Sequence, residues 1–160
     1  MSEIKPDIEI IIATELTEDL LKACQRLVPQ LTTNNPPPSS EQLIQMLASP
    51  SSILFLARHR DFGEEILGMA TLVLYYVPTG LRGYLEDFVV DIRARNIGMG
   101  ESLLQACLEK AKQAGAPQVM LTSNPIRKTA NQLYLRMGFE IRKTNVYRFN
   151  LLQDYVGNLG

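Results

Sequence analysis

The chain has 160 residues, of which 46% are hydrophobic and 21% are charged, and its formal net charge at pH 7 is −1. This composition is typical of one ordinary globular domain, and the near-zero charge argues against a nucleic-acid or membrane-surface partner. Two cysteines and a single histidine, His59, offer no metal-ligand spacing, so no metal site is expected.

No apolar run is long enough to span a bilayer, and residues 1–6 lack the apolar core of a signal peptide. Cys24 and Cys107 fall on the apolar faces of predicted helices, which favours reduced core thiols. We therefore expect a cytoplasmic protein whose residues 1–160 form a single domain.

The first third of the chain is predicted to form one strand and two helices. An apolar, β-branched run predicts a strand over residues 8–13. Thr17, followed by two acidic residues, predicts the start of a helix that reaches residue 28. Three prolines make residues 34–40 a loop inside the domain, and Ser40 is the expected cap of a helix over residues 41–47.

Three strands are predicted next. Residues 53–59 and 65–77 have the composition of two strands joined by a turn at residues 60–63, and a third strand is expected over residues 84–91. In that third strand, alternation predicts that Tyr84, Glu86 and Phe88 share one face, while Leu85, Asp87 and Val89 share the other.

The last third is predicted to alternate helices and strands. Apolar spacing and a terminal glycine predict a helix from about residue 98 to residue 115. Then come a strand over residues 118–122, a helix from residue 127 or 128 to residue 137, and two final strands over residues 139–143 and 147–151. The whole order is an α/β fold with a mixed sheet.

The junction between the third predicted strand and the helix that follows has the features of an anion site. Arg95, Gly98 and Gly100 lie where the strand becomes the helix. Glycine lets a backbone approach a ligand closely, and a helix start offers unpaired N–H groups at the positive end of the helix dipole. We therefore predict that this junction holds a phosphate or pyrophosphate.

The spacing excludes two common phosphate sites. A Walker loop needs four residues between its glycines and then a Lys-Ser/Thr pair, which this segment lacks. A dinucleotide fingerprint needs a third glycine where this chain has Leu103.

A second motif lies downstream, in the helix predicted to end at residue 137: Ala130-x-x-x-Tyr134-x-x-x-Gly138-Phe139. Together with Arg95-x-x-Gly98-x-Gly100 it resembles the GNAT superfamily of acyl-CoA-dependent N-acetyltransferases. The resemblance covers roughly residues 53–151. It implies a V-splayed central sheet of about seven strands flanked by about four helices, with coenzyme A lying in the splay.

The resemblance also implies the chemistry, which is direct transfer of an acetyl group from acetyl-CoA to a primary amine in a ternary complex. It assigns the pyrophosphate cradle to backbone N–H groups of residues 97–102, with Arg95 adding charge, and it assigns the polarisation of the thioester carbonyl to the backbone of Val90. The cofactor-binding residues expected on this basis are Phe88, Val89, Val90, Arg95, Asn96, Ile97, Gly98, Met99, Gly100, Glu101, Ser102, Asn124, Asn131 and Tyr134.

Two residues are the candidate catalysts, and both have a plainer interpretation. Tyr134 occupies the position of the family's general acid, although a core tyrosine on an amphipathic helix has the same sequence pattern. Glu86 is the candidate base for the amine, although it could equally bind a cationic substrate or serve as an ordinary sheet carboxylate.

Other positions leave the interpretation open. Asn131 and Asn124 could bind the pantetheine arm, but Asn124-Pro125 is equally explained as a turn into a helix. Arg127 and Lys128 could reach the 3′-phosphate or could form a solvated helix start. Arg127 also departs from the family pattern, which often has Asn at this position. The residues between Arg95 and Gly98 depart from it as well, because a cation is common there in the family.

Other functions remain possible on the sequence alone. A non-catalytic acyl-CoA-binding regulatory module would share the fold, and an unrelated nucleotide-binding α/β domain would bind ATP or NAD instead. A covalent mechanism is disfavoured because Cys107 lies on a core helix face and Cys24 lies far from both motifs. The acceptor is expected to be a small molecule or a peptide, and a homodimer is permitted but not indicated.

Overall fold

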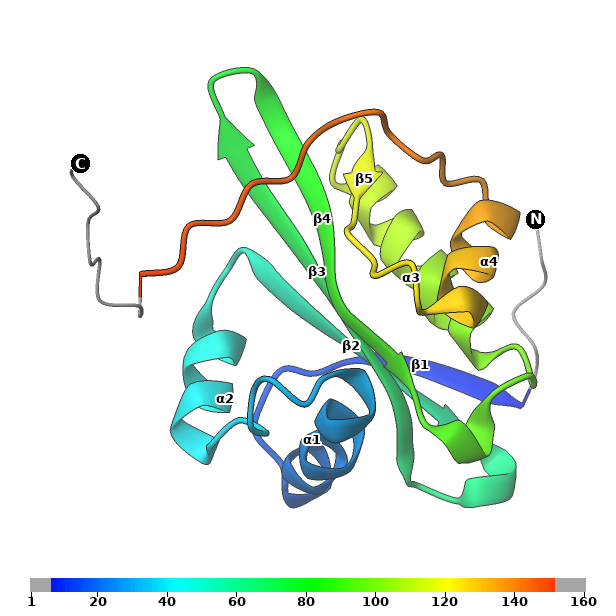
Figure 1. The fold of residues 1–160 in the computed structure, drawn as a ribbon. Helices are drawn as coiled ribbons and strands as arrows, with labels where there is room; N and C mark the ends of the chain where they lie inside the picture. Colours follow the sequence, from blue (N-terminus) through cyan, green and yellow to red (C-terminus); the bar gives the residue numbers. More distant parts are fainter. Residues whose placement is uncertain (1–6, 152–160) are drawn as a thin grey trace, which may run out of the picture.

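The computed structural model describes residues 7–151, which form a mixed sheet with helices on both faces (Figure 1). Within these residues the sheet has five strands in the order β1-β2-β3-β4-β5. Residues 1–6, the segment that lacks the features of a signal peptide, lie outside the described range. In the described part of the chain, no helix is both long and apolar enough to cross a membrane.

Strands β1 to β4 form an antiparallel meander in which each strand pairs with the next one along the chain. They span Ile8–Ile12, Ser52–His59, Ile66–Val77 and Gly80–Val90. Strand β5, Val119–Met120, runs parallel to β4 and pairs with it only at Gly83 and Tyr84. The predicted α/β class with a mixed sheet is confirmed, and the sheet opens between β4 and β5 beyond Tyr84.

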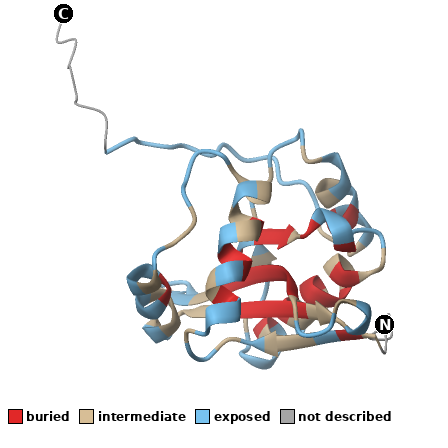
Figure 2. Ribbon diagram, turned by 90° about the horizontal axis from the view of Figure 1, so that it is seen from below, coloured by how far each residue is buried: buried red, intermediate tan, exposed pale blue. Residues whose placement is uncertain are grey.

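The four helices lie in two layers (Figure 1). Helices α1, Glu18–Leu31, and α2, Ser40–Ala48, cover one face, whereas α3, Met99–Gln113, and α4, Lys128–Arg136, cover the other. Alternation along β2 serves both layers, because Leu54 and Leu56 pack with α1 and α2 while Phe55 and Ala57 belong to the cluster with α3 and α4. Figure 2 shows the buried residues gathered on the sheet and on the inward faces of the helices.

Local sequence signals predict the helix ends to within a few residues. The Leu20 N–H donates to the Thr17 side chain at 3.1 Å, as the predicted cap requires. Ser39, one residue earlier than expected, caps α2 in a capping box with Gln42. After α3, Gly115 has a φ of 84°, the left-handed conformation expected where glycine ends a helix.

The predicted alternation along β4 is wrong because a β-bulge interrupts the strand. Thr71 pairs with Glu86 and Met69 with Val89, so two residues of β4 lie opposite one residue of β3. Asp87 in this bulge has a φ of 49°. As a result Leu85 and Phe88 belong to the same core cluster, whereas Glu86 and Asp87 are both exposed.

The last two predicted strands do not form. Residues 140–150 follow α4 as exposed chain without regular structure, and Figure 2 shows them running clear of the sheet. A strand is stable only beside another strand, and no segment of the described chain pairs with this one. The expectation of about seven strands therefore overestimates the sheet within the described residues.

Candidate active site

The opening between β4 and β5 exposes one backbone edge of β4. Beyond Tyr84 the carbonyls on this side accept hydrogen bonds from arginine side chains. The Phe88 carbonyl accepts from Arg127 Nη2 at 2.9 Å, and the Val90 carbonyl accepts from Arg95 Nε at 3.1 Å. An extended ligand that replaced these two guanidinium groups would meet a strand edge, which suits a chain of amide groups.

The start of α3 closes one end of this edge. Gly98 is its N-cap, with a φ of 92°, and no side chain caps the helix. Helices α1 and α2, by contrast, are capped by the side chains of Thr17 and Ser39. The first N–H groups of α3 therefore have no acceptor within the helix or from a capping side chain, and the positive end of the helix dipole lies with them. This is the geometry predicted for the anion site.

Gly100 has a packing role beside its predicted place in the anion site. A Cβ at this position would lie 3.1 Å from Leu133 Cδ2 and 3.5 Å from Phe88 Cζ. Its lack of a side chain lets α3 approach α4 and β4 closely, and it thereby brings the second motif up to the first. Met99 and Ser102 are buried in the same junction, while Arg95 and Asn96 are exposed beside it and Ile97 is half-buried.

A buried carboxylate fixes the loop that leads into α3. Asp91 has no exposed surface and accepts hydrogen bonds from Arg26 Nε of α1 at 3.0 Å and from Arg93 Nη2 at 2.8 Å. The Arg93 hydrogen bonds lower the pKa of Asp91 well below its usual range, against the opposing effect of desolvation. Glu65 binds both arginines, at 3.2 Å from Arg26 and 2.7 Å from Arg93. No sequence pattern pointed to this network, because Arg26, Glu65 and Asp91 lie far apart in the chain.

Tyr134 lies at the other side of the opening, in an aromatic cluster. It is only 6% exposed, and its ring centroid is 5.8 Å from that of Phe88 and 5.9 Å from that of Phe139. Burial raises the pKa of Tyr134, and the charge and hydrogen bonding of Arg127 oppose that rise. Tyr134 is thus a core tyrosine with a cation beside its hydroxyl, so the two interpretations from the sequence are compatible.

Asn124 and Asn131 shape the loop between β5 and α4. The side chain of Asn124 accepts from the Ile126 N–H at 3.0 Å, and the side chain of Asn131 donates to the Asn124 carbonyl at 3.0 Å. These contacts match the alternative view of Asn124 as a turn residue. In the same loop the hydroxyl of Ser123 is buried and has no hydrogen-bond partner within the described residues. Sequence reasoning missed Ser123, whose only signal was its place directly before Asn124.

Glu86 and Asp87 form an acidic pair at the bulge. Desolvation, and secondarily the neighbouring charge of Asp87, raise the pKa of Glu86. A carboxylate with a raised pKa is a better proton acceptor near neutral pH than an ordinary glutamate. Two adjacent exposed carboxylates also attract a cationic amine.

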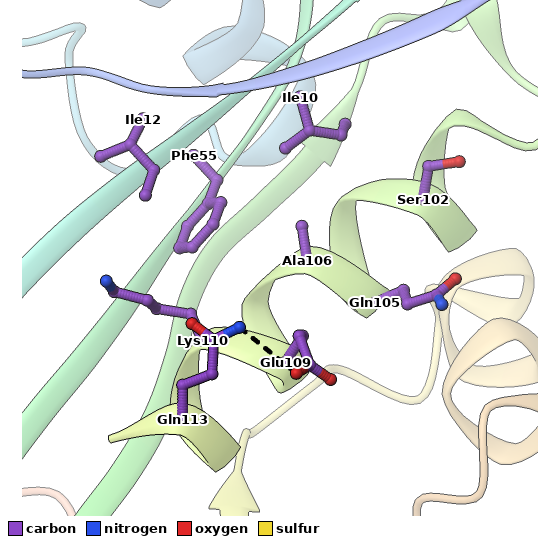
Figure 3. A pocket seen from close by; sticks show the side chains of 9 residues that line it. All are labelled: Ile10, Ile12, Phe55, Ser102, Gln105, Ala106, Glu109, Lys110 and Gln113. Carbon is purple, nitrogen blue, oxygen red and sulfur yellow. Dashed lines mark hydrogen bonds between the residues drawn. The ribbon is translucent and has the colours of Figure 1, made fainter. Parts of the chain in front are cut away.

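A separate hollow lies on the far side of α3 (Figure 3). It has a volume of about 680 Å³ and lies between α3 and the β1–β2 edge. Ile10, Ile12 and Phe55 form its apolar wall, and a Gln113–Glu109 hydrogen bond of 3.3 Å lies on its polar side. Of the predicted site residues only Ser102 lines this hollow, so it is distinct from the opening beside β4.

The sequence profile of the acetyltransferase (GNAT) family matches residues 13–139. The chain belongs to this family. A search of curated proteins finds no match. The family match identifies the chain as an N-acetyltransferase of the GNAT family. It confirms, at the level of the family, the expectation drawn from Arg95, Gly98, Gly100 and the second motif.

Solved structures agree on the fold. An aminoglycoside acetyltransferase from an uncultured soil metagenomic sample is 20% identical with a TM-score of 0.78, and the match covers 94% of this chain and 100% of that one. An acetyltransferase of Trypanosoma brucei is 26% identical with a TM-score of 0.71, covering 91% and 100%. Glucosamine-6-phosphate N-acetyltransferase of Arabidopsis thaliana is 18% identical with a TM-score of 0.69, covering 88% and 98%.

Neither cysteine of this GNAT protein is suited to a covalent step. Cys24 and Cys107 are both buried, and burial raises the pKa of their thiols to about 11 and about 12. A thiol acts as a nucleophile through its thiolate, which these two groups do not form near neutral pH.

Proposed function

We propose that this chain transfers an acetyl group from acetyl-CoA directly to a primary amine of a small molecule. One observation carries the proposal: the uncapped start of α3 lies beside the exposed edge of β4, with Tyr134 on the opposite side of the opening. The family match supports the co-substrate, and the aminoglycoside and glucosamine-6-phosphate enzymes of similar fold support a small amine acceptor.

The residues present fit acetyl-CoA. The free N–H groups at the start of α3, near the charge of Arg95, suit a pyrophosphate, and the edge of β4 suits the amide groups of pantetheine. The orphaned hydroxyl of Ser123 is available to the same arm. Acetyl-CoA supplies an acetyl group activated by its thioester bond.

The protein groups handle the protons of the reaction. The acetyl group leaves its sulfur for the amine nitrogen, so the amine must lose a proton and the sulfur must gain one. Glu86, with its raised pKa, accepts the proton from the amine. Tyr134 donates a proton to the sulfur, and Arg127 stabilises the tyrosinate that this leaves.

The test is free-thiol release from acetyl-CoA against a panel of amines, with Tyr134→Phe alongside. Phe keeps the ring contacts with Phe88 and Phe139, so the fold is preserved while the hydroxyl is lost. We expect kcat to fall by about 100-fold or more, with the KM for acetyl-CoA nearly unchanged.

Two other outcomes would contradict this mechanism. An unchanged kcat in Tyr134→Phe would remove Tyr134 as the acid. Calorimetric binding of coenzyme A without thiol release for any amine would favour the alternative of a non-catalytic acyl-CoA-binding module.

A further inference from the structure

Arg127 lies where the pantetheine arm is proposed to bind, and it also lies beside the proposed acid. Its Nη2 donates to the Phe88 carbonyl at 2.9 Å, on the open edge of β4. The same guanidinium group acts on the hydroxyl of Tyr134 through its charge and through hydrogen bonding. One side chain therefore connects the strand edge with the aromatic cluster on the other side of the opening.

The open edge of β4 needs hydrogen-bond donors because it lacks a neighbouring strand. Strand β5 pairs with β4 at only two residue pairs, and the carbonyls of Phe88 and Val90 lie beyond them. Arg127 satisfies the first carbonyl and Arg95, at 3.1 Å, satisfies the second. A guanidinium group makes a strong, charge-assisted hydrogen bond to a carbonyl that would otherwise lack a donor. The two side chains thus take the place of a missing strand.

The backbone that carries Arg127 is held in place by the loop before α4. Its N–H donates to the Asn124 carbonyl at 3.0 Å, and its carbonyl accepts from the Asn131 N–H at 3.0 Å. The Asn131 side chain donates to the same Asn124 carbonyl at 3.0 Å. Removal of the guanidinium group from Phe88 therefore requires only rotation about side-chain bonds, and the start of α4 stays where it is.

Tyr134 is the group toward which this side chain can turn. It follows Arg127 by seven residues, close to two helical turns, so both side chains lie on one side of α4. The Phe139 N–H donates to the Tyr134 carbonyl at 2.9 Å, and the tyrosine ring packs between those of Phe88 and Phe139, which fixes its position. No carboxylate of the described residues pairs with Arg127, so no ion pair has to break when it moves.

We propose that coenzyme A and Arg127 compete for the Phe88 carbonyl, and that the guanidinium group, once displaced, binds Tyr134 alone. In the free protein Arg127 is shared between the carbonyl and the hydroxyl. An amide N–H of the pantetheine arm that takes the carbonyl ends this sharing. Arg127 is then a positioning residue that strengthens the proposed acid only when the co-substrate is present. The inference rests on the proposed function, because it places pantetheine on the edge of β4.

This competition lowers the affinity for the coenzyme. A protein whose binding-competent form is a minor fraction binds its ligand more weakly in proportion to that fraction. The charge-assisted hydrogen bond from Arg127 to Phe88 makes the form with a free carbonyl the minor one. The affinity that is lost secures an order of events, since the acid is strengthened only after the acetyl group has arrived.

The first test compares the affinity for coenzyme A, measured by calorimetry, in the parent protein, Arg127→Met and Arg136→Met. Met keeps the apolar stem of the side chain but has no donor, so it leaves the Phe88 carbonyl free. We expect Arg127→Met to bind coenzyme A about tenfold more tightly than the parent. Arg136→Met makes the same replacement at the exposed end of α4 and should bind as the parent does. Circular dichroism verifies that both variants fold.

The second test follows Tyr134 in the unaltered protein. Tyrosinate absorbance is titrated with and without coenzyme A, and Tyr134→Phe under the same conditions is the blank. A cation beside a phenol favours the ionised form, so coenzyme A should lower the pKa of Tyr134 in the parent. It should not lower this pKa in Arg127→Met. If Arg127 only held the fold together, the titration would not depend on the coenzyme in this way.

Two results would overturn the inference and leave the proposed activity intact. Equal or weaker binding of coenzyme A by Arg127→Met would exclude competition, and weaker binding would mean that Arg127 contacts the coenzyme directly. A pKa of Tyr134 that coenzyme A does not lower in the parent would mean that Arg127 is not redirected to the hydroxyl. Failure of both the parent and Arg127→Met to bind coenzyme A would contradict the proposed function itself, and the inference with it.

Discussion

Arg127 is placed to tune the acidity of Tyr134, the proposed proton donor. The guanidinium group of Arg127 donates to the Phe88 carbonyl at 2.9 Å and lies close enough to the Tyr134 hydroxyl to lower its pKa. Burial acts in the opposite direction and is the larger effect. A positive charge beside an acid favours its conjugate base, so Arg127 makes Tyr134 a better proton donor.

Removing this charge should therefore raise the pKa of Tyr134 further. In Arg127→Gln we expect tyrosinate to form at a higher pH, measured by ultraviolet absorbance titration with the Tyr134→Phe protein as the blank. We also expect kcat to fall by about tenfold to a hundredfold. Lys128→Gln removes the same charge one residue away and should change neither quantity. An unshifted titration in Arg127→Gln would mean that Arg127 does not influence the pKa of Tyr134.

At the acidic pair of the bulge, removing a charge should lower a pKa instead of raising it. Asp87 helps to raise the pKa of Glu86, so Asp87→Asn should lower that pKa and move the acidic limb of kcat/KM to lower pH. Asn tolerates the positive φ of 49° at this position, which keeps the bulge in place. Glu86→Gln should abolish the limb. A limb that stays in place in both variants would mean that Glu86 is not the base.

At the scale of elements, the network around Asp91 joins α1, the start of β3 and the loop into α3. Replacing its buried carboxylate leaves Glu65 as the ion-pair partner of Arg26 and Arg93 among the described residues, while Arg26 keeps its hydrogen bond to the Ile66 carbonyl. We expect Asp91→Asn to lower the free energy of unfolding by about 2 kcal/mol, less than for a fully buried pair because both arginines are partly exposed. Glu65→Gln, on the exposed side of the network, should lower it by less than about 1 kcal/mol.

The pH dependence of this effect has a definite sign. The folded pKa of Asp91 lies below the unfolded value of about 3.9, so its contribution is complete above that pH and is lost as the pH falls further. The free energies of unfolding of the parent protein and of Asp91→Asn, measured by urea denaturation, should differ most near neutral pH and converge in acid. A difference that grew in acid would contradict the assignment of the ionised carboxylate.

Elements whose signals are local were predicted well from the sequence. Thr17 and Gly115 mark helix ends through their own backbone preferences, and the structure confirms both. The strands over residues 139–143 and 147–151 were wrong, because alternation shows only that a segment can pair and not that a neighbour is present.

The site was predictable in its motifs and not in its contacts. Arg95, Gly98 and the second motif are contiguous sequence patterns, and they led to the correct family. The Arg127 hydrogen bond to Phe88 joins residues 39 positions apart, and the bulge at Asp87 arises from pairing with β3, so neither could be seen in a single sequence. The packing role of Gly100 likewise depends on Leu133, a residue of another helix.

At the scale of the whole molecule, the two faces of the sheet have different tasks. Helices α1 and α2 pack on one face, and Arg26 of α1 binds Asp91 in the loop that leads into α3. Helices α3 and α4 lie on the other face and carry the two motifs. The opening between β4 and β5 is thus bordered by α3 and α4, while Arg26 from the other face holds the loop that leads into α3.

The simple order of the sheet has a consequence for how the chain folds. Strands β2 to β4 follow one another in space in chain order, so their pairing requires only short loop closures, whereas residues 13–51 with α1 and α2 separate β1 from β2. Strand β5 pairs with β4 at only two residue pairs, and α4, which carries Tyr134, follows it in the chain. We therefore expect β5 and α4 to join after the meander has formed, and local unfolding in the native state to release them before it reaches the meander.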